Sequence, residues 1–163
     1  MKNSDIYEDY GSVDIAVIED FEKKIGYCLP TSYKELISSH DWLRPEQNTF
    51  AFINLYGEKD DRDVNFYGYK SGFSLASRTI EHHQDFDVYG YEGIVAIGFS
   101  ANGDHICFDY RHDPKTCEPR VVLMYHDDYV EDATGNAHMV VNDVAPTCEA
   151  FIDMLYKYED EET

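Results

Sequence analysis

The chain has 163 residues, a length that favours one domain with a real hydrophobic core. It carries 33 acidic and 13 basic side chains, for a formal net charge of −20. This excess argues against a nucleic-acid-binding protein, because phosphate contacts need Lys and Arg, and against docking on anionic lipid. It suits a partner protein with a basic surface, since complementary potentials steer encounter, although acidic surfaces also serve solubility alone.

The N-terminus and the cysteines predict a soluble, cytoplasmic protein. The first ten residues are polar and acidic, unlike a signal peptide, and no apolar run approaches the ~18 residues that span a bilayer. The four cysteines stand at positions 28, 107, 117 and 148, and none forms a C-x-x-C pair. We therefore expect buried free thiols in a reducing compartment.

Two helices are predicted after a flexible lead-in at residues 1–12. The first begins at a cap provided by Ser12 or Asp14 and ends at Gly26, and Lys residues in its last turn complement the helix dipole. Its apolar positions recur at helical spacing: Ile15, Ile18, Phe21 and Ile25. The second starts at Pro30, a residue suited to a first turn, and has an apolar face of Tyr33, Leu36 and Ile37.

The rest of the chain reads mainly as strands joined by charged loops. Strands are predicted at 50–56, 64–69, 94–99, 105–110 and 121–125. Loops are predicted at 57–63 and 126–132, and a short helix at 78–86. Asn102-Gly103 is a hairpin turn signal because both residues tolerate positive φ.

A last helix is predicted after Thr147, with an apolar stripe of Cys148, Phe151, Ile152 and Leu155, and the acidic residues 159–163 should be flexible. The order of elements predicts a single α+β domain over residues 1–163. Its sheet should be mostly antiparallel and packed by the N-terminal helix pair and the C-terminal helix.

Several short motifs resemble the SMI1/KNR4 family, of the SUKH superfamily, over residues 13–156. They are Lys23-Lys24-Ile25-Gly26, Leu29-Pro30-x-x-Tyr33-Lys34-Glu35-Leu36, Ile97-Gly98, Gly103-Asp104-x-Ile106-x-Phe108-Asp109, and Val144-Ala145 before a helix with Glu149, Phe151 and Leu155. One departure is the segment Ser39-His40-Asp41-Trp42, which stands where the family often has a Gly-Gly-type turn.

The resemblance implies, for most members, a bacterial immunity protein that binds the catalytic domain of a cognate toxin, often a nuclease. The alternative it implies is a non-catalytic regulatory scaffold that binds signalling or cell-wall-synthesis proteins. A fold shared by both roles does not decide between them.

No residue pattern supports an enzyme, so we expect no catalytic residues, no metal and no cofactor. Gly103-Asp104 and Gly135-Asn136-Ala137-His138 only faintly resemble metallophosphoesterase motifs, because the upstream Asp-x-His is missing. The adjacent His82 and His83 would point about 100° apart on a helix and would not share a metal easily. Asp109 is more simply explained as a residue that binds backbone N–H groups at a strand end.

The candidate partner-binding residues are carboxylates in the charged segments together with nearby tyrosines. The carboxylates are Asp60, Asp61, Asp63, Asp85, Asp87, Glu92, Asp127, Asp128, Glu131 and Asp132. Tyr89, Tyr91 and Tyr129 are the aromatic candidates, because Tyr contributes large contact area at small entropy cost. The simpler alternatives are solvated loop charges and half-buried sheet tyrosines.

Overall fold

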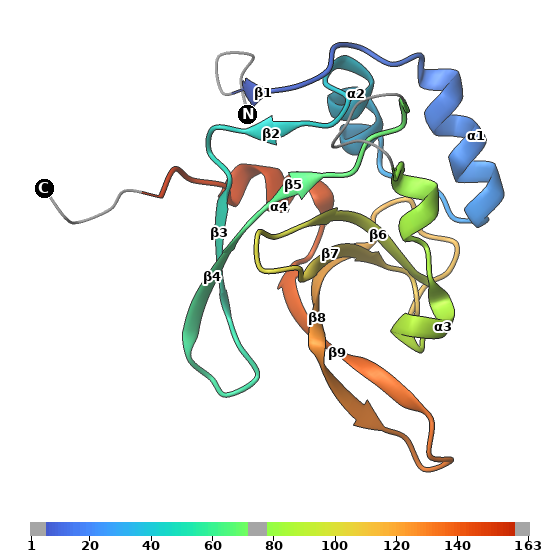
Figure 1. The fold of residues 1–163 in the computed structure, drawn as a ribbon, viewed down its shortest axis with the longest axis vertical. Coiled ribbons are helices and arrows are strands. Elements are labelled where there is room, and N and C mark those ends of the chain that lie inside the picture. Colours follow the sequence, from blue (N-terminus) through green and yellow to red (C-terminus); the bar gives the residue numbers. More distant parts are fainter. Residues whose placement is uncertain (1–5, 72–77, 159–163) are drawn as a thin grey trace, which may run out of the picture.

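The computed structural model describes residues 6–71 and 78–158 (Figure 1). The predictions of flexible residues at 1–5 and 159–163 lie outside the described residues. Among the described helices, none has both the length and the apolar character to cross a membrane.

The helices of the described residues are α1 (Ile15–Ile25), α2 (Thr31–Ser39), the 3-10 helix η2 (Ile80–His83), α3 (Phe86–Tyr89) and α4 (Cys148–Met154). Side chains cap the N-termini of α1, α3 and α4. The Asp14 carboxylate accepts a hydrogen bond from the Ala16 N–H at 3.0 Å, which satisfies a free donor of α1. Gly26 ends α1 in the left-handed conformation, with φ 78°. The predicted helix pair and C-terminal helix are therefore confirmed.

Every strand pair in the described residues is antiparallel. The main sheet has the order β5 (Asn65–Phe66), β6 (Ile94–Phe99), β7 (His105–Asp109), β8 (Arg120–Glu131) and β9 (Ala137–Ala145). Two smaller sheets pair β1 (Ile6–Glu8) with β2 (Arg44–Pro45), and β3 (Thr49–Ile53) with β4 (Lys59–Asp63). The predicted α+β class is confirmed, with three antiparallel sheets instead of one.

The core lies between the main sheet and the helices. Helix α1 contacts α2, α2 contacts α4, and α4 contacts β3, β8 and β9. The Tyr33 ring meets Phe108 of the sheet edge-on, with ring centroids 5.3 Å apart. Phe151 of α4 meets Phe50 of β3 in the same way, at 5.2 Å. Aromatic pairs in this geometry stabilise more than their buried area alone would.

The charged segments were assigned wrongly from the sequence. β1 occupies part of the predicted lead-in, β4 replaces the loop predicted at 57–63, β8 continues through the loop predicted at 126–132, and β9 was not predicted. The predicted helix at 78–86 is instead η2 followed by α3. The outer half of β8 lacks an apolar alternation because its residues are exposed on both faces, and β4 consists of charged residues only. Their pairing is set by the turns that close the hairpins.

The segment that departs from the family pattern is held by a buried aspartate. The Asp41 carboxylate accepts hydrogen bonds from the N–H groups of Tyr69 at 2.8 Å and Lys70 at 3.0 Å. Trp42 adopts a φ of 57°, a conformation that usually requires Gly. Its indole N–H donates to the Lys70 carbonyl at 2.9 Å, and its ring lies over Gly68, where a Cβ would come within 2.2 Å. Trp42 thus makes this turn without a glycine.

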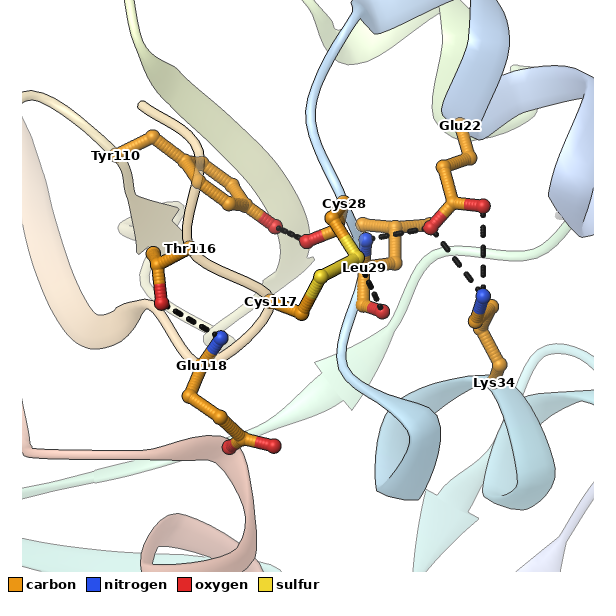
Figure 2. The surroundings of a disulfide bond; sticks show 8 residues. All are labelled: Glu22, Cys28, Leu29, Lys34, Tyr110, Thr116, Cys117 and Glu118. Atoms are coloured by element: carbon orange, nitrogen blue, oxygen red, sulfur yellow. Dashed lines mark hydrogen bonds and ion pairs between the residues drawn. A yellow bond between two sulfur atoms is a disulfide. The ribbon is translucent and has the colours of Figure 1, made fainter. Parts of the chain in front are cut away.

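A disulfide joins Cys28 to Cys117, which are separated by 89 positions in sequence and by 4.7 Å between their Cα atoms. The expectation of four free thiols is therefore wrong for this pair, while Cys107 and Cys148 are free and buried. The bond connects the α1–α2 loop with the β7–β8 loop (Figure 2). Tyr110 supports the first loop by donating its hydroxyl proton to the Cys28 carbonyl at 2.6 Å. Residues this distant in sequence meet only in the folded chain, so spacing alone did not reveal the pair.

Reduction of this disulfide should lower the free energy of unfolding by about 3–5 kcal/mol, because the reduced unfolded chain regains the entropy of a long loop. The measurement is chemical denaturation with and without dithiothreitol, with thiols counted in each sample. Cys117→Ser is the control and should show no dependence on reductant. Equal stability of the oxidised and fully reduced wild-type protein would contradict the prediction.

Candidate functional site

Asp127, Asp128 and Glu131 lie on the outer half of β8. This half runs beyond the main sheet as a two-stranded ribbon with β9 (Figure 1). Met124 faces Val141, but Tyr129 faces Met139, so β8 contains extra residues between these two pairs. Such a bulge bends a strand and redirects its side chains. Here it lies between Met124 and Tyr129, a stretch that includes the exposed Asp127 and Asp128.

The bulge is anchored by Asp104, which is only 1% exposed. The Asp104 carboxylate accepts hydrogen bonds from the His126 N–H at 3.1 Å, from Arg62 Nε at 3.2 Å and from Asn102 Nδ2 at 3.1 Å. The His126 ring adds a further contact, Nδ1 to Oδ1 at 2.7 Å. Burial alone would raise the pKa of Asp104, but the hydrogen bonds from His126 and Arg62 outweigh it, so the pKa is lowered.

Arg62 connects β4 with this junction. Its guanidinium also binds Asp60 Oδ1 at 3.0 Å and lies 6.0 Å from the centre of the Tyr125 ring. Burial raises the pKa of Tyr125, Arg62 opposes that shift, and the negative charges of Asp60, Asp104 and Asp128 add to it. Asp60, Asp104 and Asp128 therefore lie close enough to act on the same side chain, although they come from β4, the β6–β7 turn and β8.

Asp104, His126 and Asp127 are the described residues that most resemble a metal site, with one ligand-type atom each inside 4.8 Å of the others. Both oxygens of Asp104 already accept hydrogen bonds, and the Arg62 guanidinium lies beside one of them. A positive charge at that distance opposes the binding of a cation. The cluster is better explained as the junction that orders the bulge.

The β8–β9 turn is fastened to α3 by His138. The Asp132 carboxylate accepts hydrogen bonds from the N–H groups of Thr134 at 2.9 Å and Asn136 at 3.0 Å. His138 Nε2 lies 2.7 Å from Asp132 Oδ2, and His138 Nδ1 contacts the Gly90 carbonyl at the end of α3. Both ring nitrogens thus face acceptors, an arrangement that only the protonated imidazolium satisfies.

The pKa values agree with this protonation state. The Asp132 hydrogen bond raises the pKa of His138, although desolvation opposes it. The hydrogen bond from His138 in turn lowers the pKa of Asp132, together with those from Thr134 and Asn136.

A shallow pocket lies where the β8–β9 turn meets α3, and its lining includes Asp87, Glu92 and His138. Tyr91 also lines it, but its ring already lies 4.7 Å from the Arg111 guanidinium, and its hydroxyl donates to the Met139 carbonyl at 3.0 Å. Tyr91 is half-buried, and both its ring and its hydroxyl already have partners within the protein.

The predicted carboxylates fall into two groups. Those with a structural partner are Asp60, which binds Arg62; Asp63, which accepts from the Ala101 N–H; Asp85, which caps α3; and Asp132, which binds His138. Those whose side chains are exposed and form no hydrogen bond or ion pair within the described part of the chain are Asp61, Asp87, Glu92, Asp127, Asp128 and Glu131. The second group is the charge available to a partner.

Of the predicted tyrosines, the structure exposes Tyr129 and buries Tyr89. Tyr89 is 3% exposed and donates its hydroxyl proton to the His83 carbonyl, so it is corrected from an interface residue to a core residue. Tyr129 is 46% exposed on the β8–β9 ribbon. Asp109 accepts a hydrogen bond from the Arg111 N–H at 3.0 Å, as predicted for a residue at a strand end.

Sequence reasoning missed the exposed apolar turn of the β3–β4 hairpin. Leu55 and Tyr56 were placed in a buried strand at 50–56, but β3 ends at Ile53 and both residues are exposed in the turn. The available signal was Asn54 followed by Gly57, a pair that favours a turn.

The SMI1 / KNR4 family (SUKH-1) model matches residues 12–154. No curated protein and no solved structure matches the chain.

Titration of His138 should loosen the β8–β9 turn as pH rises. A histidine with a raised pKa stabilises fully below about 6.5, its unfolded value, and this contribution is lost as pH rises through the folded pKa. Asp132, with a lowered pKa, stabilises above about 3.9 and loses its contribution as pH falls through its own folded pKa. The pair should therefore hold the turn best between about pH 4 and 6.5.

The measurement is an NMR titration of the Thr134 and Asn136 backbone amides in wild type and His138→Gln. The wild-type amides should shift with the titration of His138, and the variant amides should not. Identical titration curves in the two proteins would show that His138 does not fasten this turn.

Proposed function

Because the chain belongs to the SMI1/KNR4 family (SUKH-1), we propose that it is an immunity protein that binds and neutralises a cognate bacterial toxin domain. The family match over residues 12–154 is the observation that carries this proposal. Members of this family are generally immunity or scaffold proteins, and the proposed role is binding without catalysis. The cytoplasm is the proposed site of action.

The unpaired carboxylates support a basic partner. Asp127, Asp128 and Glu131 lie on the ribbon, and Asp87 and Glu92 line the pocket beside its turn. None of them is neutralised by a neighbouring cation within the described residues, so their negative potential extends into solvent. A charged surface of one sign attracts an oppositely charged partner and raises the association rate.

The proposed target is a nuclease domain, and the proposed mechanism is occlusion of its active site. A nuclease presents Lys and Arg to the phosphates of its substrate. Carboxylates at the ribbon and pocket would pair with those cations and exclude the nucleic acid. Asp60, Asp63, Asp85 and Asp132, which already have partners, would shape this surface without contributing free charge to it.

The test is association with the toxin domain encoded by the adjacent gene, measured by stopped-flow at increasing salt. Asp128→Lys with Glu131→Lys should lower the on-rate at least about tenfold at low salt, and the difference should shrink as salt screens the charges beyond roughly 8 Å. Exposed charges at an interface rim act mainly on encounter.

The matched control is Glu19→Lys with Glu35→Lys, which makes the same change in net charge on the exposed faces of α1 and α2. Its on-rate should stay near that of wild type. Equal losses in both double variants would show that net charge, and not this surface, steers association. Absence of any complex with the toxin domain would overturn the immunity proposal and leave the regulatory scaffold as the alternative.

A further inference from the structure

The β3–β4 hairpin displays large apolar side chains at its tip. Tyr56 is 85% exposed, Leu55 59% and Ile53 61%. Single exposed apolar residues are common on protein surfaces, whereas a group of them on one projecting element marks an interaction site.

The turn that carries these side chains is held by its own hydrogen bonds. Asn54 Oδ1 accepts from the N–H groups of Tyr56 at 2.9 Å and Glu58 at 3.0 Å. The Gly57 N–H donates to the Asn54 carbonyl at 3.0 Å, and Gly57 has a φ of 78°. The apolar tip is therefore presented by a defined turn, which reduces the entropy cost of binding.

The β8–β9 turn has the same construction and contains no large apolar residue. Asp132 Oδ1 accepts from the N–H groups two and four residues later, as Asn54 Oδ1 does, and Gly135 has a φ of 84° at the position of Gly57. Ala133 and Thr134 stand where the first turn has Leu55 and Tyr56. This kind of turn therefore forms without apolar side chains, and Leu55 and Tyr56 are not needed to build it.

The tip has a fixed position relative to the acidic ribbon. Asn142 of β9 donates its side-chain N–H to the Ile53 carbonyl at 3.0 Å, and Arg62 of β4 binds the Asp104 junction beneath the β8 bulge. Both hairpins extend away from the α1–α2 end of the molecule (Figure 1). A single partner can thus reach the apolar tip and the ribbon together.

The charge of the whole chain selects the kind of partner. The tip itself carries both signs, because Glu58 and Lys59 are exposed and Lys59 faces Ile53 across the hairpin, but the chain carries a net charge of −20. Repulsion between like charges disfavours a second copy of this chain, an anionic lipid surface and a nucleic acid. A protein with a basic surface is the class of partner that remains.

We propose that Leu55 and Tyr56, together with Ile53, form the apolar anchor that a basic partner protein buries in a pocket on its surface. This inference rests on the proposed function and assigns the anchor to the cognate toxin domain. Buried aromatic and aliphatic anchors act mainly on dissociation, while exposed charges act mainly on association. The apolar tip and the acidic ribbon should therefore control different rate constants.

The experiment compares wild type with Leu55→Ala, Tyr56→Thr, a double variant that gives the first turn the residues of the second. The probe is the toxin domain encoded by the adjacent gene, and binding is followed by surface plasmon resonance. The Kd should rise at least about 30-fold through a faster dissociation rate, at low and at high salt alike. The melting temperature should not change, because both replaced side chains are exposed and the turn keeps Asn54 and Gly57.

The outcomes separate this inference from the function on which it rests. Tight binding of wild type with an unchanged dissociation rate in the variant would overturn the anchor and leave the immunity role intact. No binding of wild type would overturn both. The matched control, Ala133→Ser with Thr134→Ser in the second turn, should bind as wild type does.

Two further measurements test the choice of partner class. Light scattering over a concentration series should show the same mass for wild type and the variant. Sedimentation with phosphatidylcholine vesicles that contain phosphatidylserine should capture neither. Self-association or vesicle binding that is lost in the double variant would assign the tip to a second copy or to lipid and would overturn the proposal.

Discussion

The geometry of the candidate surface depends on one buried carboxylate, that of Asp104. It receives hydrogen bonds from Arg62 on β4 and from the backbone of His126 on β8, and it lies in the turn that joins β6 to β7. Removal of this carboxylate would leave a partly buried guanidinium and a backbone N–H without their acceptor, which is costly in a protein interior. This junction connects the β8 bulge with Arg62 of β4, and the Asn142–Ile53 hydrogen bond makes a second connection between the two hairpins.

The acidic excess of the chain is divided between structural and available charge. Asp85 caps a helix, Asp132 closes a turn, and Asp63 accepts a backbone hydrogen bond. Backbone N–H dipoles, and for Asp132 the His138 ring, partly compensate the negative charges of these side chains. Asp127, Asp128 and Glu131 carry no such partner within the described residues, so their charge is exposed to solvent on the outer half of β8.

The apolar tip and the acidic ribbon offer a partner two different kinds of interaction. Exposed charge acts at long range and is screened by salt, whereas apolar area acts only in contact and is not screened by salt. In the proposed complex, the acidic ribbon would speed association and the apolar tip would slow dissociation. The disulfide lies elsewhere, between the α1–α2 and β7–β8 loops, and acts on stability instead of on this surface.

The sequence by itself determined the helices, the buried strands and the family. Asp14 and Gly26 bound α1, Thr147 begins α4, and the apolar runs at 94–99 and 121–124 form β6 and the inner half of β8, because capping and burial leave local patterns. It identified the acidic segments from which the candidate surface is drawn. It did not identify β4, β9 or the outer half of β8. The residues of β4 and most of those in the outer half of β8 are polar and carry no periodic signal of burial.

Only the tertiary structure decided which of the predicted residues face solvent and which are used internally. Tyr89 and Tyr129 are the same residue type in similar acidic surroundings, yet one is in the core and the other on the ribbon. Three contacts join segments far apart in the chain: the disulfide of Cys28 with Cys117, the hydrogen bond from Trp42 to the Lys70 carbonyl, and the contact of His138 with Gly90. Such contacts depend on how the sheet and the turns bring distant segments together. A local sequence pattern does not specify which distant residues become neighbours in the folded chain.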